Sequence, residues 1–127
     1  MFSIDNQSRT PVYEQIIAQV ERFILAGYLN PNEQLPSVRN VSVSLSVNPN
    51  TIQKAFTDLD RRKIIYSVPG KGSYVSADAT EIISKSRIFE LEKIEAAARE
   101  MFLARIDKNV IINTIEKIYS EKENKEL

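Results

Sequence analysis

Residues 35–56 read LPSVRNVSVSLSVNPNTIQKAF, and this stretch contains two helix start signals in close succession. Ser37 is a good N-cap for a short helix over residues 38–45, because its hydroxyl can accept a hydrogen bond from an unpaired backbone amide. Asn48 can cap a second helix, which has a proline at its first position and ends near Arg62. Two short helices joined this tightly predict a helix-turn-helix.

Both helices carry their apolar residues on one side. This spacing of three or four residues is typical of a helix that buries one face in a core. Phe56 is therefore predicted to be a core residue. The predicted buried positions are Val38, Val41 and Leu45 on the first helix, and Ile52, Ala55, Phe56 and Leu59 on the second.

An amphipathic helix precedes this motif. We expect Thr10 to cap it, Pro11 to take its first position and Gly27 to end it. Its apolar side chains recur at helical spacing and predict one buried face. These residues are Val12, Ile16, Val20, Phe23 and Ile24.

Strand-forming residues follow the motif. Residues 64–68 read IIYSV, residues 69–72 read PGKG, and residues 73–75 read SYV. A cluster of glycine and proline between two such runs predicts a β-hairpin. A helix-turn-helix followed by a hairpin is a winged helix, so we expect residues 1–76 to form a winged helix-turn-helix domain.

Residues 77–127 are predicted to form a short C-terminal segment of two helices. One covers about residues 80–105, and the other begins after Asp107, the expected N-cap. Two isolated helices have too little neighbouring core to cover their apolar faces, so a second copy must do so. The sequence therefore predicts a homodimer and an α+β fold, mostly α, in which a winged helix-turn-helix domain precedes a dimerisation segment.

Composition excludes several classes of protein. The 127 residues include no cysteine and no histidine, which excludes disulfides, Cys/His zinc sites, a catalytic thiolate and an imidazole base. No residue pair indicates an active site, so we expect no enzyme, no cofactor and no metal. The N-terminus has no apolar signal region, and no apolar run is long enough to span a membrane. These features favour a cytoplasmic protein without a membrane partner.

Charge is distributed unevenly along the chain although its formal net value is zero. Residues 36–75 carry a net charge of +4, from six basic and two acidic side chains. Residues 77–127 carry a net charge of −2, from nine basic and eleven acidic side chains. A basic block confined to the helix-turn-helix and the hairpin is typical of a surface that binds phosphate. The carboxylates of the C-terminal segment alternate with basic residues and predict a salt-bridged solvent face instead of a metal site.

Three runs, Leu35–Arg39, Val47–Ile52 and Gly70–Val75, resemble motifs of the GntR family of bacterial regulators in their order and spacing. The resemblance covers roughly residues 10–76, and the short C-terminal segment is similar to that of the YtrA-type subgroup. It implies a winged-helix dimer that binds a palindromic operator, usually as a repressor. Ser46 and Lys63 depart from the family pattern, because glycine usually closes both turns and favours a left-handed backbone there.

The N-terminal half of a recognition helix is the part that reaches base edges in the major groove. Asparagine and glutamine can pair with adenine through two hydrogen bonds, and a threonine methyl can contact thymine. Asn48 is also the expected cap, so backbone amides should occupy part of its side chain. The candidate base-reading residues are Asn48, Asn50, Thr51, Gln53 and Lys54.

Four further residues are candidates for DNA contact. The resemblance assigns Arg39 to DNA, and its guanidinium suits a guanine or a phosphate. Ser37 combines capping with a phosphate contact, since helix N-termini attract anions. On the hairpin, Lys71 supplies charge and Gly72 lets the backbone approach the minor groove.

The sequence is also compatible with two other functions. A winged helix can instead serve as a protein-protein interaction module, which a salt-dependent DNA-binding measurement would distinguish. A small effector would have to bind between subunits, because two helices enclose too little space within one subunit. The string Gly-Lys-Gly-Ser at residues 70–73 does not fit a phosphate-binding loop, which needs a glycine at the position of Ile65.

Overall fold

The computed structural model describes residues 2–121. The chain divides into two compact units, Met1–Ser84 and Lys85–Leu127. The change in composition along the sequence predicts a boundary between residues 76 and 77. The structural division lies further along, because Ala79 and Ile83 are buried with the core of the first unit.

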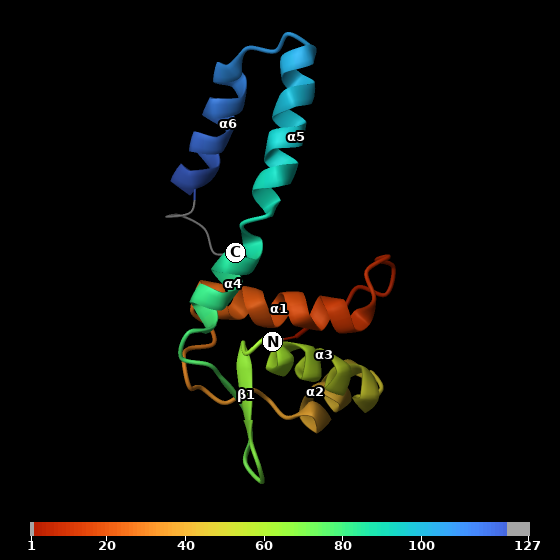
Figure 1. The fold of residues 1–127 in the computed structure, drawn as a ribbon. Coiled ribbons are helices and arrows are strands. Elements are labelled where there is room, and N and C mark those ends of the chain that lie inside the picture. The colour runs from red at the N-terminus through yellow and green to blue at the C-terminus, as the bar shows by residue number, and fades with distance from the viewer. Residues whose placement is uncertain (1, 122–127) are drawn as a thin grey trace. The chain divides into compact units, whose positions relative to one another are not determined.

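The first unit is a helix-turn-helix followed by a two-stranded hairpin, so the predicted winged-helix fold is confirmed (Figure 1). Helix α1 packs on α3, and α3 in turn packs on α2 and β1. In Figure 1 the hairpin extends away from α1. The elements are α1 (Val12–Ala26), α2 (Val38–Leu45), α3 (Pro49–Arg61), β1 (Ile65–Val68), β2 (Gly72–Val75) and the start of α4 (Ala79–Arg87).

The core of the first unit contains most of the apolar positions that the sequence predicts, whereas Val12, Phe23, Val38 and Leu45 are only partly buried at its edge. Ile16, Val20 and Ile24 of α1 are buried together with Ile52, Ala55, Phe56 and Leu59 of α3. Phe56 is only 4% exposed, which confirms its assignment to the core. The same core contains Leu29, Leu35, Val41, Ile64, Ile65, Val75, Ala79 and Ile83.

Two of the three predicted N-caps in this unit are present. Ser37 Oγ accepts a hydrogen bond from the Asn40 amide at 3.0 Å, and Asn48 Oδ1 accepts one from the Asn50 amide at 2.8 Å. The prediction that Thr10 caps α1 is wrong. Helix α1 begins at Val12, one residue later than expected, so Pro11 is its cap residue. The proline side chain makes no capping hydrogen bond.

The two positions without the usual glycine nevertheless adopt left-handed backbone. Ser46 has φ 55° after α2, and Lys63 has φ 65° after α3. The Val47 amide donates to the Ser42 carbonyl, and the Ile64 amide donates to the Leu59 carbonyl, so both helix ends are closed by hydrogen bonds. Both turns therefore form although serine and lysine disfavour the left-handed backbone by about 1 kcal/mol each.

The hairpin pairs β1 with β2 in antiparallel register, Ile65 opposite Val75 and Val68 opposite Gly72. The segment before α2 joins its other edge: the Leu35 amide donates to the Ser73 carbonyl, and the Val75 amide donates to the Glu33 carbonyl. The base of the wing is therefore held on both sides by backbone hydrogen bonds.

The second unit contains α5 (Glu90–Leu103) and α6 (Lys108–Glu121). The prediction of one helix over residues 80–105 is wrong, because Ile88 and Phe89 form a turn between α4 and α5. No glycine or proline marks this break in the sequence. At the start of α6, Asp107 Oδ1 accepts the Asn109 amide at 2.8 Å, which confirms the predicted cap.

Neither α5 nor α6 has a buried residue. Their large apolar side chains stay open to solvent: Leu91, Ile94, Phe102, Leu103, Val110, Ile112, Ile115, Ile118 and Tyr119. The predicted salt-bridged polar face is present, with Lys93 paired to Glu90 at 3.2 Å and Arg99 to Glu95 at 2.6 Å. Across residues 2–121, no helix combines the length and apolarity needed to cross a membrane.

Candidate nucleic-acid interface

Helix α3 presents one face to the core and the other to solvent. Since Ile52, Ala55 and Phe56 point inward, the side chains of Asn50, Gln53 and Lys54 are left exposed. Thr51 is half-buried at the edge of this face. The phase of the helix, fixed by its core residues, thus places the predicted base-reading residues on the accessible surface.

The two cap residues have side-chain oxygens that are already engaged. Ser37 and Asn48 each accept a backbone amide, as described above. Their remaining capacity is the serine hydroxyl hydrogen and the asparagine NH₂ group, which are donors and suit phosphate or base acceptors. Both residues are exposed at the start of their helices.

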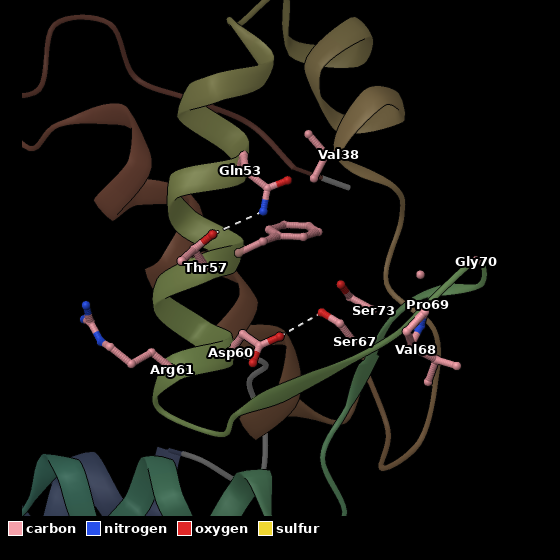
Figure 2. A pocket seen from close by; sticks show the side chains of 12 residues that line it. Val38, Gln53, Thr57, Asp60, Arg61, Ser67, Val68, Pro69, Gly70 and Ser73 are labelled. Atoms are coloured by element: carbon pink, nitrogen blue, oxygen red, sulfur yellow. Dashed lines mark hydrogen bonds between the residues drawn. The ribbon is translucent and has the colours of Figure 1, made fainter.

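A groove of about 550 Å³ separates α3 from the wing (Figure 2). Gln53, Asp60 and Arg61 line it from α3, while Ser67 and Gly70 line it from the hairpin. Val38 at the start of α2 also lines the groove. The groove therefore brings together α3, the hairpin and the start of α2, and two of the nine candidate residues, Gln53 and Gly72, line it.

Two hydrogen bonds order the walls of this groove. Gln53 Nε2 donates to Thr57 Oγ1 at 3.2 Å, one turn along α3. Ser67 Oγ donates to Asp60 Oδ2 at 2.7 Å and links β1 to α3 (Figure 2). The second bond restricts the angle between the wing and the recognition helix.

Lys54 is turned toward α1. Its Nζ lies 3.9 Å from the centre of the Tyr13 ring, a cation–π contact. The Glu14 carboxylate raises the pKa of the Tyr13 hydroxyl, which accordingly stays protonated at neutral pH. Nothing in the spacing of the chain pairs residue 13 with residue 54, so the sequence alone does not predict this contact.

Arg39 is exposed at the start of α2. The alternative to a DNA contact is a surface ion pair with Glu33 or Asp58. Within the described residues, Glu33 instead accepts the Asn30 amide at 2.9 Å, and Asp58 pairs with Arg61 at 2.7 Å. The guanidinium of Arg39 is thus left facing solvent, where a guanine or a phosphate can reach it.

The three basic residues at the end of α3, Arg61, Arg62 and Lys63, make different contacts. Arg62 forms an ion pair with Glu21 of α1, whose side chain is only 5% exposed, and lies 3.5 Å from Asp58. Arg61 pairs with Asp58. Arg62 therefore joins the end of α3 to α1, Arg61 pairs within α3 itself, and Lys63 occupies the left-handed turn. The sequence does not predict the ion pair of Glu21, because an acidic residue on an apolar helix face has no recognisable pattern of its own.

The tip of the wing is exposed and carries Lys71 between two glycines. The Lys71 amide donates to the Val68 carbonyl at 2.9 Å, and Gly70 has φ 76°. Proline followed by a glycine with positive φ is typical of a type II turn. The turn displays the Lys71 side chain at the end of the hairpin, as a wing contact to DNA requires.

Comparison with known proteins agrees with this geometry. The profile of the bacterial regulatory proteins of the gntR family matches residues 12–75. The HTH-type transcriptional repressor YtrA of Bacillus subtilis (strain 168) is 40% identical over 88 residues, which are 69% of this chain and 68% of that protein.

Solved structures give the same result. A GntR family transcriptional regulator from Listeria monocytogenes superposes with a TM-score of 0.70 at 32% identity, over 90% of this chain and 98% of that one. The DNA-binding domain of AraR in complex with operator ORE1 superposes with a TM-score of 0.52 at 27% identity, over 57% and 89% of the two chains. These matches are to transcriptional regulators and not to enzymes. This chain belongs to the GntR family of bacterial regulatory proteins.

Proposed function

We propose that this protein is a cytoplasmic transcriptional repressor that binds a palindromic DNA operator as a homodimer. The observation that carries the proposal is the exposed face of α3 beside an exposed basic wing tip. A helix N-terminal half with amide and hydroxyl side chains suits base edges, and a lysine on a glycine-rich turn suits the minor groove. The repressor assignment is supported by the name of the Bacillus subtilis relative.

In this proposal the nine candidate residues divide into two classes. Side chains of α3 read bases, whereas the start of α2 and the wing hold the DNA backbone. Lys54 joins the second class, because its ammonium is held against Tyr13 at the side of α3. The base-reading class is Asn48, Asn50, Thr51 and Gln53, and the anchoring class is Ser37, Arg39, Lys54, Lys71 and Gly72.

The homodimer is proposed from the second unit. Ile94 is 51% exposed and Ile118 is 57% exposed, and both lie among further exposed apolar side chains. A second copy of α5 and α6 would cover these residues and place two recognition helices on one duplex. Two-fold symmetry of the protein would then be matched by a palindromic operator.

An effector site between subunits is a second candidate function. A groove of about 680 Å³ lies on the second unit between apolar residues and two cations, Arg105 and Lys108. It is open to solvent in the single chain, so a small ligand would need the partner subunit to enclose it. Titration of the DNA complex with anionic amphiphiles, read as release of DNA, would test this candidate.

The proposed docking predicts that substitution of a base-contacting residue and substitution of a phosphate-contacting residue change DNA binding in different ways. Asn50→Ala or Gln53→Ala should weaken operator binding by about 1–3 kcal/mol and relax sequence preference, while non-specific affinity is nearly kept. Lys71→Ala should weaken all sequences more evenly and lower the slope of log K against log salt by about one unit per lost phosphate contact. The measurement is binding to operator and scrambled duplexes, after operator selection from random DNA, across a salt series.

The opposite pattern would contradict this docking. If Lys71→Ala changed base preference and Asn50→Ala changed only the salt slope, α3 could not be the element in the major groove. Binding that does not depend on salt in the unmodified protein would instead favour the alternative function, a protein-protein interaction module.

A further inference from the structure

The tip of the wing is held by one side chain from a distant part of the sequence. Gln34 Nε2 donates a hydrogen bond to the Lys71 backbone carbonyl at 2.7 Å. Gln34 precedes α2, and its backbone forms an isolated bridge with Tyr74 of β2. The residue therefore belongs to the segment that flanks the hairpin, and its side chain extends along the hairpin toward the tip.

The base and the tip of the wing are held in different ways. Backbone hydrogen bonds fix β2 from its last residue, where the Val75 amide donates to the Glu33 carbonyl, up to Ser73, whose carbonyl accepts the Leu35 amide, and the Ser67–Asp60 bond fixes β1 to α3. Beyond these points, the contact from Gln34 is the hydrogen bond that joins the described tip residues to the body of the first unit. Loss of this bond should free the tip without opening the base.

Gly72 is shaped to accept this contact. A Cβ atom added there would lie 2.9 Å from Gln34 Nε2, closer than real Cβ contacts allow. Gly72 also has φ 124°, which side-chain-bearing residues rarely adopt. This glycine is therefore needed for the approach of Gln34, independently of any approach to DNA.

We propose that Gln34 is a positioning residue for DNA binding, which fixes the peptide after Lys71 and thereby the direction of the Lys71 side chain. The inference rests on the proposed function, because it assumes that Lys71 contacts DNA. A lysine on an ordered turn loses less conformational entropy on binding than one on a mobile turn. Gln34 acts through the wing and needs no contact with DNA itself.

The test is the substitution Gln34→Met in the full-length protein, which keeps the length of the side chain and removes the donor. We expect operator affinity to fall about three- to tenfold per wing, the range set by one net hydrogen bond. The ¹⁵N heteronuclear NOE should fall for Gly70, Lys71 and Gly72 and remain high for Ile65 and Val75. The melting temperature should stay close to that of the unmodified protein, because Gln34 is exposed.

A double-mutant cycle separates wing positioning from a general effect. If Gln34 acts through Lys71, then Lys71→Ala should weaken binding less in the Gln34→Met background than in the unmodified protein. Gln34→Lys restores a donor of similar reach and should restore the NOE of the tip. Equal effects of Lys71→Ala in both backgrounds, or an unchanged NOE in Gln34→Met, would overturn the inference.

Failure of the proposed function gives a different result. In that case the unmodified protein shows no salt-dependent binding to any duplex, and the DNA role of Gln34 is overturned with it. The NOE measurement still reports whether Gln34 orders the tip. If the unmodified protein binds its operator and Gln34→Met binds equally well, only the inference about Gln34 is wrong.

Discussion

Replacement of Phe56 by alanine is expected to lower the free energy of unfolding of the first unit by about 3–5 kcal/mol. Phe56 is 4% exposed and lies in the core with Ile52 and Leu59 of the same helix. Its removal leaves a cavity that the surrounding side chains fill only in part, which adds to the lost burial of the ring. Urea unfolding followed by circular dichroism measures the change.

Thr57→Ala is the matched control, because the neighbouring residue is exposed on the same helix. It should change the free energy of unfolding by no more than about 0.5 kcal/mol. If Phe56→Ala kept the stability of the unmodified protein and lost only DNA binding, the phase assigned to α3 would be wrong. The exposed positions of Asn50 and Gln53 would then be wrong as well, since the same phase places them.

The pair of substitutions Ile94→Glu and Ile118→Glu is expected to convert the proposed homodimer to a monomer. Both side chains are more than half exposed in the single chain, so the monomer should remain folded. In a dimer interface the two carboxylates would be buried without partners, which is strongly unfavourable. Operator affinity should then fall by about 100-fold or more, because linked half-sites gain about 10²–10⁴ in affinity.

Light scattering at tens of micromolar and operator binding are the two measurements. Ala96→Glu with Asn113→Glu is the matched control, since it adds the same charge at exposed positions on the opposite sides of α5 and α6. This control should stay dimeric. A monomeric unmodified protein at that concentration would contradict the homodimer proposal, whatever the variants do.

The winged helix could be predicted from the sequence because local signals and core spacing agree there. Ser37 and Asn48 cap the helices that follow them, and the spacing of Ile52 and Phe56 fixes which side of α3 is buried. Local consistency of this kind also explains why the turn after α2 forms with Ser46 in place of glycine. The propensity of one residue is overridden by the packing of its neighbours.

Other features depend on contacts between distant residues and left no local signal. The break between α4 and α5 at Ile88 and Phe89 has no glycine or proline, so the sequence pattern predicts one uninterrupted helix there. Glu21 and Gln34 make their contacts with residues 62 and 71, and neither position stands out in composition or periodicity. The sequence thus indicates the side chains of the proposed DNA contacts, which stay a prediction, but it does not indicate the side chains that hold them in place.

The ion pair between Glu21 and Arg62 has a consequence for how this sequence can vary. Removal of Arg62 breaks the ion pair of a carboxylate that is only 5% exposed at the junction of α1 and α3, and breaking the pair of a buried charge is strongly destabilising. Removal of Glu21 costs less, because Arg62 also lies 3.5 Å from Asp58. Replacement of both by apolar residues of similar volume is often tolerated. The two positions therefore constrain each other unequally: a change at residue 62 is expected to be tolerated mainly together with a change at residue 21, whereas Asp58 still faces Arg62 after a change at residue 21 alone.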